Sequence, residues 1–258
     1  MHGSFIWHEL MTPDTGAAKA FYTKILGWTP NDMEMPGFTY TTFAVPDFPS
    51  GVAGMMALTP EMTSQGIPPN WTGYVQVDDV DAMAADYKKA GGTVHREPED
   101  IPDIGRFAVV ADPQGAVLCI MTPKMADGSA GTWPEPSTPG TVGWNELMAG
   151  DAPSAFDFYS ARFGWQKDMA VDMGQLGVYQ TFKLGDRGIG GMMTKLPEMP
   201  VPYWGFYFTV PALDPAVEQV KALGGTLMMG PQEVPGGAWI ANCIDPQGAY
   251  FSLVASKR

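Results

Sequence analysis

The sequence predicts an α+β protein of four βαβββ modules arranged as two tandem domains. The first observation is that the chain aligns with itself. WHELMTPDTGAAKAFYTKILGW at 7–28 matches WNELMAGDAPSAFDFYSARFGW at 144–165, and GVAGMM at 51–56 matches GIGGMM at 188–193. The second observation is that each copy contains the order strand, helix, strands twice. Self-similarity over this length indicates duplication of a whole domain.

The first module opens with a strand, FIWHELM, and continues into a helix. Asp14 is the expected N-cap, because a short polar side chain stands directly before apolar residues at helical spacing. Gly27 is expected to end this helix. The strand-like runs FTYTTFAV and GVAGMMAL follow.

The second module repeats this order. TGYVQV reads as a strand and VDAMAADYKKA as a helix ended by Gly91 and Gly92, before the strands TVHRE, RFAVVA and AVLCIM. The pentapeptide DPQGA occurs at 112–116 and again at 245–249, each time between two apolar runs. Because Asp-Pro starts a turn and Gly supplies positive φ, DPQGA is predicted to be the tight turn between the last two strands of its module.

These signals divide the chain into two domains. The first covers 1–125 and holds modules at 5–58 and 71–123. The segment ADGSAGTWPEPSTPGT at 126–141 is rich in Gly, Pro, Ser and Thr and reads as a linker. The second domain covers 142–258, and its modules are expected at 142–195 and 203–255.

Composition excludes several classes of function. The chain of 258 residues carries 28 acidic and 15 basic residues, a formal charge of −13, so nucleic acid and anionic membrane surfaces are poor partners. It has neither a long uninterrupted apolar run nor an N-terminal signal-peptide pattern. Its two cysteines, Cys119 and Cys243, are too few for a disulfide framework. A cytoplasmic protein is the resulting expectation.

The combined motifs resemble the vicinal oxygen chelate superfamily, the group of glyoxalase I, the bleomycin-resistance proteins and the extradiol dioxygenases. The resemblance lies in paired βαβββ modules, in the helix pattern D-x-x-x-A-x-x-F-Y-x-x-x-x-G-W, and in the closing DP-x-G turn. FYTKILGW and FYSARFGW show the helix end in both copies. The resemblance covers nearly the whole chain and implies two tandem glyoxalase-like domains with curved mixed sheets. This fold hosts lyases, isomerases, dioxygenases and drug binders, so it does not fix a reaction.

The metal ligands that the resemblance implies are missing here. Family members that carry a metal hold it with a His near the start of a module's first strand and a Glu in the strand after the DP-x-G turn. None of the matching residues is a typical ligand for a hard cation. These residues are Trp7, Thr72, Cys119, Trp144, Trp204 and Ser252. We therefore expect no metal and no other cofactor, with a divalent metal at an unconventional site as the minority alternative.

Glu9 and Glu146 are the predicted catalytic residues. In WHEL and WNEL the Trp and the Glu are two positions apart, so both side chains face the side of the lost ligand position. A carboxylate among apolar side chains is desolvated, which suits a general acid or base. The alternative is a structural role in which each Glu bonds to backbone or to an arginine such as Arg106 or Arg162.

Aromatic and methionine side chains on the expected site strands are the predicted substrate-binding residues. Ordinary core packing is the alternative for each of them. The set is Trp7, Met11, Tyr40, Phe43, Met56, Tyr74, Trp144, Tyr179, Met193, Trp204 and Phe206.

The predicted function is a glyoxalase-like enzyme of lyase, isomerase or hydrolase type that acts on a small oxygenated or aromatic metabolite. It would use a site-facing Glu as general acid or base, without the usual metal. The alternative is a non-catalytic protein that sequesters a small molecule, as bleomycin-resistance proteins do. The expected partner is a small-molecule ligand, and the chain is expected to be a monomer or a homodimer.

Overall fold

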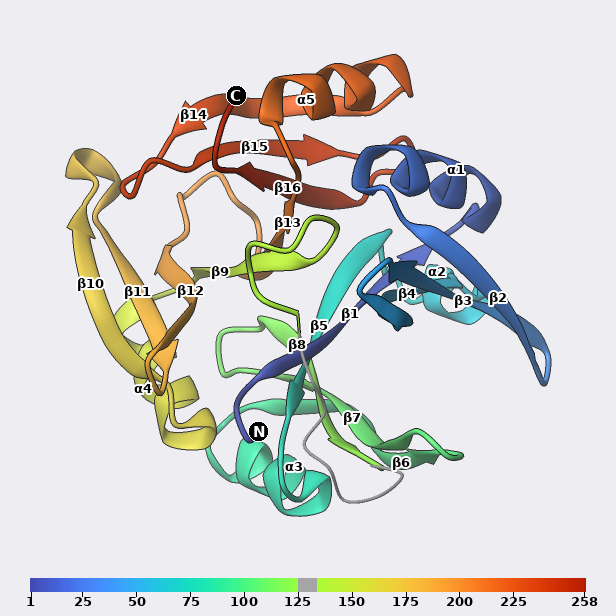
Figure 1. The fold of residues 1–258 in the computed structure, drawn as a ribbon. Helices are drawn as coiled ribbons and strands as arrows, with labels where there is room; N and C mark the ends of the chain where they lie inside the picture. Colours follow the sequence, from blue (N-terminus) through green and yellow to red (C-terminus); the bar gives the residue numbers. More distant parts are fainter. Residues whose placement is uncertain (125–133) are drawn as a thin grey trace. The chain divides into compact units, whose positions relative to one another are not determined.

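The computed structural model describes residues 1–124 and 134–258 and contains two mixed sheets of eight strands each (Figure 1). The strand order of the first sheet is β2-β3-β4-β1-β5-β8-β7-β6. The pairs β1–β4 and β5–β8 are parallel, whereas β2–β3–β4 and β6–β7–β8 are antiparallel. The strands are β1 (Phe5–Thr12), β2 (Thr29–Met35), β3 (Phe38–Val45), β4 (Phe48–Ala57), β5 (Asn70–Gln76), β6 (Thr93–Ile101), β7 (Gly105–Ala111) and β8 (Val117–Pro123).

The second sheet repeats this topology with the order β10-β11-β12-β9-β13-β16-β15-β14. Its β9–β12 and β13–β16 pairs are parallel and its outer pairs antiparallel. The predicted α+β class and the four βαβββ modules are therefore confirmed. The strands are β9 (Val142–Ala149), β10 (Gln166–Asp172), β11 (Val178–Leu184), β12 (Arg187–Thr194), β13 (Tyr203–Thr209), β14 (Thr226–Glu233), β15 (Trp239–Ile244) and β16 (Tyr250–Ala255).

Helix boundaries follow the cap residues of the sequence. The Asp14 carboxylate accepts a hydrogen bond from the Ala17 N–H at 2.9 Å, and Gly27 ends the helix in the left-handed region at φ +69°. The duplicated helix has the same caps, Asp151 and Gly164. The helices are α1 (Thr15–Leu26), α2 (Pro60–Ser64), α3 (Val80–Lys89), α4 (Ala152–Phe163) and α5 (Leu213–Ala222), with a 3-10 turn at Gly174–Leu176.

The chain forms two compact units, and each takes one module from each sequence copy. Unit 1 comprises the described parts of 1–6, 72–133 and 145–204. Unit 2 comprises 7–71, the described part of 134–144, and 205–258. The first module thus packs with the fourth, and α1 lies beside α5 (Figure 1).

A buried Tyr–Asp–Trp cluster joins the two modules of unit 2. The Tyr22 hydroxyl donates to Asp245 Oδ2 at 2.9 Å, and the Trp71 indole N–H donates to the Tyr22 oxygen at 3.0 Å. Asp245, the first residue of the second DPQGA turn, also accepts the N–H groups of Gln247 and Ala249 at 2.9 Å each. Burial raises the pKa of Asp245, although its hydrogen bonds act in the opposite direction.

Unit 1 contains the same cluster in its own copy. The Tyr159 hydroxyl donates to Asp112 Oδ2 at 3.1 Å, and the Trp204 indole donates to Tyr159 at 3.2 Å. Asp112 accepts from the N–H groups of Gln114 and Ala116 at 2.8 and 3.0 Å. The DPQGA aspartate therefore does more than start a turn, because it also binds the helix tyrosine of the other sequence copy.

The segment expected to be a linker is only partly described, since 126–133 lie outside the described residues. Its remaining part, 134–141, belongs to unit 2. The Gly140 carbonyl accepts the Trp28 indole N–H at 2.6 Å, and the Gly140 N–H donates to Thr209. In the described part of the chain, no helix is long and apolar enough to cross a membrane.

Candidate functional site

Strand β1 places Trp7, Glu9 and Met11 on one face. Burial alternates along the strand, so these three side chains are partly exposed while their neighbours are buried. His8 lies on the opposite, buried face, with its ring edge-on to Phe206 at a centroid distance of 4.8 Å. The Glu9 carboxylate thus stands between an indole and a thioether.

Tyr40 links Trp7 to Glu9. The Tyr40 hydroxyl donates to Glu9 Oε2 at 2.7 Å, and the Trp7 indole N–H donates to the Tyr40 oxygen at 3.0 Å. Because an indole N–H can only donate, the phenol must use its own proton toward the carboxylate. Trp7 therefore fixes the direction of the Tyr40 proton, and the three residues form one ordered chain of donors and acceptors.

Gly54 makes room for this chain. It lies opposite Glu9 in the parallel β1–β4 register. A Cβ at Gly54 would lie 2.0 Å from the Tyr40 hydroxyl oxygen and 2.8 Å from the Trp7 indole nitrogen. The Tyr40 hydroxyl can cross β4 toward Glu9 only because this position carries no side chain.

The second copy repeats the arrangement in unit 1. Glu146 lies opposite Gly191 in the β9–β12 register, and a Cβ at Gly191 would lie 2.4 Å from the Tyr179 hydroxyl. Asn145 takes the place of His8, and its amide donates to the Ile189 carbonyl at 2.7 Å. Glu146 is buried, with 7% of its surface exposed, whereas Glu9 is half-buried. The two copies therefore share the Glu–Tyr–Gly arrangement, but Glu9 is more exposed to solvent than Glu146.

Methionines flank both carboxylates. Met11 pairs with Met56 in the β1–β4 register, two residues beyond the Glu9–Gly54 pair. Met148 and Met193 hold the corresponding positions beside Glu146. These thioethers leave the face of each carboxylate apolar and deformable.

Three predicted binding residues lie in the core instead. Phe43 is fully buried and stacks on Trp28 at 4.6 Å, because it stands three positions after Tyr40 and so faces the other side of β3. Trp204 is bound to Tyr159, and Phe206 is buried against His8 on the same face of β13. These residues stabilise the fold and do not join the Glu9 or Glu146 groups.

Tyr74 and Trp144 are the remaining predicted binding residues. Tyr74 is buried on β5 in unit 1, with its ring 6.2 Å from that of Phe107. Trp144 is half-buried on β9 and belongs to unit 2.

The arginines named as structural partners for the glutamates have carboxylate partners of their own. Arg106 binds Asp81 and Asp100, and Arg162 binds Asp86 at 2.9 Å.

Strand register corrects one of the expected ligand positions. Tyr74 pairs with Cys119 in β5–β8, and Tyr207 pairs with Ser252 in β13–β16. The residue that matches Thr72 is therefore Gly205, and Trp204 instead matches Trp71, whose indole also binds a helix tyrosine.

The donor set at these positions does not fit a metal. Trp7, Thr72 and Cys119 in one copy, and Trp144, Gly205 and Ser252 in the other, offer two hydroxyls and one thiol. Across the described residues, no three His, Cys, Asp or Glu side chains gather as a metal-binding group. Burial raises the pKa of the other thiol, Cys243, to about 12, which keeps it protonated and unreactive.

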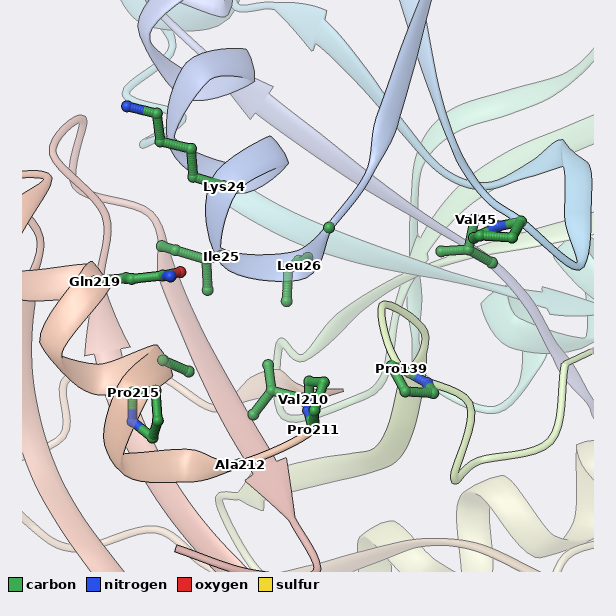
Figure 2. Close-up of a pocket in the computed structure, with 13 residues that line it drawn as sticks. Lys24, Ile25, Leu26, Val45, Pro139, Val210, Pro211, Ala212, Pro215 and Gln219 are labelled. Carbon is green, nitrogen blue, oxygen red and sulfur yellow. The ribbon is translucent and has the colours of Figure 1, made fainter.

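A hollow of unit 2 lies away from the Glu9 site. It has a volume of about 480 Å³ and is lined by the end of α1, the start of α5 and the residues around Pro139 (Figure 2). Its lining is mostly aliphatic and proline, with Lys24 and Gln219 as polar members. A hollow of about 530 Å³ in unit 1 is lined by Asp100, Asp103, Arg106 and Lys124, which already form ion pairs. Neither offers the convergent polar groups of the Glu9 site.

The sequence analysis does not predict the tyrosines that bind the two glutamates, nor the Tyr–Asp–Trp clusters that join the modules of each unit. The glycines of GVAGMM and GIGGMM indicate a close approach at Gly54 and Gly191. No sequence signal shows that the side chains of Tyr40 and Tyr179 lie against these glycines. The Tyr–Asp–Trp clusters were signalled by the retention of both Tyr and Asp in each copy.

Comparison with known proteins agrees with the fold described above. The model of the Glyoxalase/Bleomycin resistance protein/Dioxygenase superfamily matches residues 5–120 and 141–253. "Putative glyoxylase CFP32" of Mycobacterium tuberculosis is 34% identical over 251 residues, covering 96% of this chain and 93% of that protein. The anthracycline biosynthesis protein DnrV of Streptomyces peucetius is 34% identical over 263 residues, covering 98% of this chain and 93% of DnrV.

Solved structures share the fold at low identity. The Mn(II)-bound glyoxalase from Novosphingobium aromaticivorans superposes with a TM-score of 0.67 at 15% identity, covering 99% of this chain and 82% of the glyoxalase. The 2,2',3-trihydroxybiphenyl 1,2-dioxygenase from Sphingomonas wittichii gives 0.66 at 12% identity, covering 99% of this chain and 91% of the dioxygenase. With two family-model matches that include both copies, the chain belongs to the glyoxalase/bleomycin resistance protein/dioxygenase superfamily.

Proposed function

We propose that this protein is an enzyme that moves a proton on a small oxygenated or aromatic metabolite, with Glu9 as the general acid or base. The observation that carries the proposal is the ordered chain from Trp7 through Tyr40 to Glu9. A positioned carboxylate contributes roughly 10²–10⁴ in rate when it transfers a proton in the transition state.

The chemistry supported best is enolisation followed by isomerisation or elimination. Glu9 would take the proton from a carbon next to a carbonyl group, the C–H electron pair would form the new C=C bond, and the C=O π pair would move onto the oxygen to give an enolate. The same carboxylic acid then returns the proton to a different atom, or a leaving group departs from the neighbouring carbon. Tyr40 holds the Glu9 carboxylate in position, and Trp7 holds Tyr40.

The relatives support an aromatic, oxygenated ligand without deciding the reaction. One is described by name as a glyoxylase and another as an anthracycline biosynthesis protein. Half-burial of Glu9 beside Met11 and Met56 suits a ligand that carries both an apolar ring and a carbonyl or hydroxyl group.

Substrate turnover of a panel of hydroxylated aromatic ketones and quinones, followed by chromatography, tests the proposal. Glu9→Gln keeps the shape of the side chain and removes the base, so turnover should fall about 100-fold or more. Glu34→Gln is the matched control, because Glu34 is exposed on β2 and accepts from Thr39 on the outside of the sheet. Equal turnover by Glu9→Gln and the wild-type protein would refute the catalytic role of Glu9.

The second candidate is sequestration of an apolar compound without chemistry, as in bleomycin resistance. The methionine-flanked face favours it, because this face offers apolar surface around one carboxylate. Under this alternative no member of the panel is consumed, and Glu9→Gln binds an apolar ligand as tightly as the wild-type protein or more tightly, since a carboxylate costs free energy to bury. Calorimetric titration of Glu9→Gln and Glu146→Gln separates the two candidates.

A further inference from the structure

The Trp7 indole lies over two glycines of β4, Gly51 and Gly54, which together form a glycine slot. A Cβ at Gly54 would lie 2.8 Å from the indole nitrogen, and a Cβ at Gly51 would lie 3.1 Å from Cη2 at the opposite end of the ring system. Both distances are shorter than an ordinary carbon contact, so a side chain at either position would push against the ring. The indole therefore occupies the space of two absent side chains, with its long axis along β4.

The glycine slot is specific in two further respects. Gly51 has a φ of +111°, in a region that residues with a side chain rarely adopt. Trp7 is half-buried, and its only polar side-chain atom donates to the Tyr40 oxygen at 3.0 Å. The ring is thus held by one hydrogen bond and by contact with β4 at both of its ends.

The indole does not replace the metal ligand that the resemblance implies at this position. An indole N–H can only donate, and here it donates to Tyr40. The space and the hydrogen bond are both fitted to an indole, so a role other than coordination has to account for Trp7. The second copy keeps the same residue types at the matching positions, which are Trp144, Tyr179, Gly188 and Gly191.

The direction of the Tyr40 proton indicates this role. A phenol O–H can rotate about its C–O bond, so by itself it has no single direction. Because the Trp7 N–H points at the Tyr40 oxygen, the phenol proton is directed to Glu9 Oε2 at 2.7 Å. A base that is held in one orientation reacts faster, since a small misplacement of a reacting group lowers the rate steeply.

We propose that Trp7, held in the glycine slot, is the positioning residue of the Glu9 site and acts on the reaction only through Tyr40. This inference rests on the proposed function and adds how its base is oriented. Gly51 and Gly54 then contribute to the reaction as well, because they decide where the indole lies.

A double-mutant cycle on turnover of the panel of hydroxylated aromatic ketones and quinones tests the inference. Trp7→Phe keeps an aromatic ring and removes the N–H, so kcat should fall about tenfold while KM stays within about threefold. Tyr40→Phe should lower kcat by about as much or more, and adding Trp7→Phe to it should change kcat by less than about twofold. Effects that multiply in the double variant, or a raised KM with unchanged kcat in Trp7→Phe, would overturn the inference.

Gly51→Ala tests the glycine slot, with Gly37→Ala as the matched control. Both glycines have positive φ, +111° and +89°, so both changes strain the backbone. Only the methyl group at Gly51 meets Trp7, since nothing lies within 4 Å of a Cβ at Gly37. Gly51→Ala should lower kcat about tenfold in the wild-type protein and less than about twofold in Trp7→Phe. A kcat of Gly51→Ala that is no lower than that of Gly37→Ala would refute the role of the slot.

An NMR signal from Tyr40 separates this inference from the proposed function, because it does not depend on turnover. In protein whose tyrosines are isotope-labelled at Cζ, the Tyr40 resonance is the one that Tyr40→Phe removes. It should move in Trp7→Phe and in Gly51→Ala, and stay in place in Gly37→Ala. If it moves as expected while Glu9→Gln turns over substrate as fast as the wild-type protein, the seating of Tyr40 by Trp7 stands and the proposed function falls. If Glu9→Gln abolishes turnover and the Tyr40 resonance does not respond to Trp7→Phe, the catalytic role of Glu9 stands and this inference is refuted.

Discussion

The Tyr22 hydroxyl binds the Asp245 carboxylate at 2.9 Å across a sequence separation of 223 residues. Tyr159 and Asp112 make the same bond in the other unit. The helix motif of each copy therefore stabilises the turn of the other copy, and two motifs that look independent in the sequence form one buried contact.

Loss of this contact should be costly. In Tyr22→Phe, the Trp71 indole N–H and one oxygen of Asp245 lose their partner in a buried setting. We expect the free energy of unfolding to fall by about 1–3 kcal/mol, which is the usual cost of leaving a buried polar group unpaired. Urea denaturation of Tyr22→Phe and of Tyr159→Phe measures this. Thr39→Ala on the exposed hairpin is the control, and a loss no larger than that control would contradict the expectation.

The buried tyrosines predict a steep loss of stability at alkaline pH. Burial raises the pKa of Tyr22, Tyr87 and Tyr159 well above the ordinary value. Because the folded state disfavours their ionised form, their contribution is fully present below the unfolded pKa of about 10 and is lost as the pH rises above it. Absorbance at 295 nm should show these three of the nine tyrosines ionising together with unfolding. Ionisation of all nine in the folded protein would contradict this.

Gly54 should not tolerate a side chain. In Gly54→Ala the new methyl group would meet the Tyr40 hydroxyl and force it away from Glu9. We expect lower stability and loss of the Tyr40–Glu9 hydrogen bond, visible in a crystal structure of the variant. Gly16→Ala is the control, because its Cβ meets no atom closer than 3.4 Å and it lies in α1. That change should stabilise the protein by up to about 1 kcal/mol.

Elemental analysis of protein purified without chelator should find no stoichiometric metal. The reason is chemical: the positions that would bind it carry Trp7, Thr72 and Cys119 in one copy, and Trp144, Gly205 and Ser252 in the other. Indole and hydroxyl groups do not replace imidazole and carboxylate as ligands. One tightly bound Mn, Zn, Ni or Fe ion per chain would show that ligands are recruited from elsewhere.

Local signals made most of the fold predictable. Asp14 and Gly27 mark the ends of α1, and DPQGA marks the turn before the last strand of each domain. The exception is β2, whose sequence TPNDMEM lacks alternation and has Pro30 at its second position, because it is an edge strand that buries little. Its sequence carries no strand signal.

The site was predictable only in part. Strand periodicity alone predicts that Trp7 and Glu9 share one face of β1, and the alternating burial of β1 is consistent with this prediction. Phe43 faces the core and not the side of Tyr40, since their spacing along β3 is odd, and Trp204 matches Trp71 and not Thr72. The Tyr40–Glu9 bond and the Tyr22–Asp245 bond depend on which strands and modules become neighbours, which local pattern does not encode.

The composition of the compact units constrains how this gene can change. Each unit draws one module from each copy, so a chain truncated after the first copy would lack the partners of both Tyr22 and Asp112. Supplying the two copies as separate polypeptides should therefore restore what either half lacks, as in a split-protein complementation system. For the same reason, we expect that loss of either copy by mutation would leave both units without one of their modules.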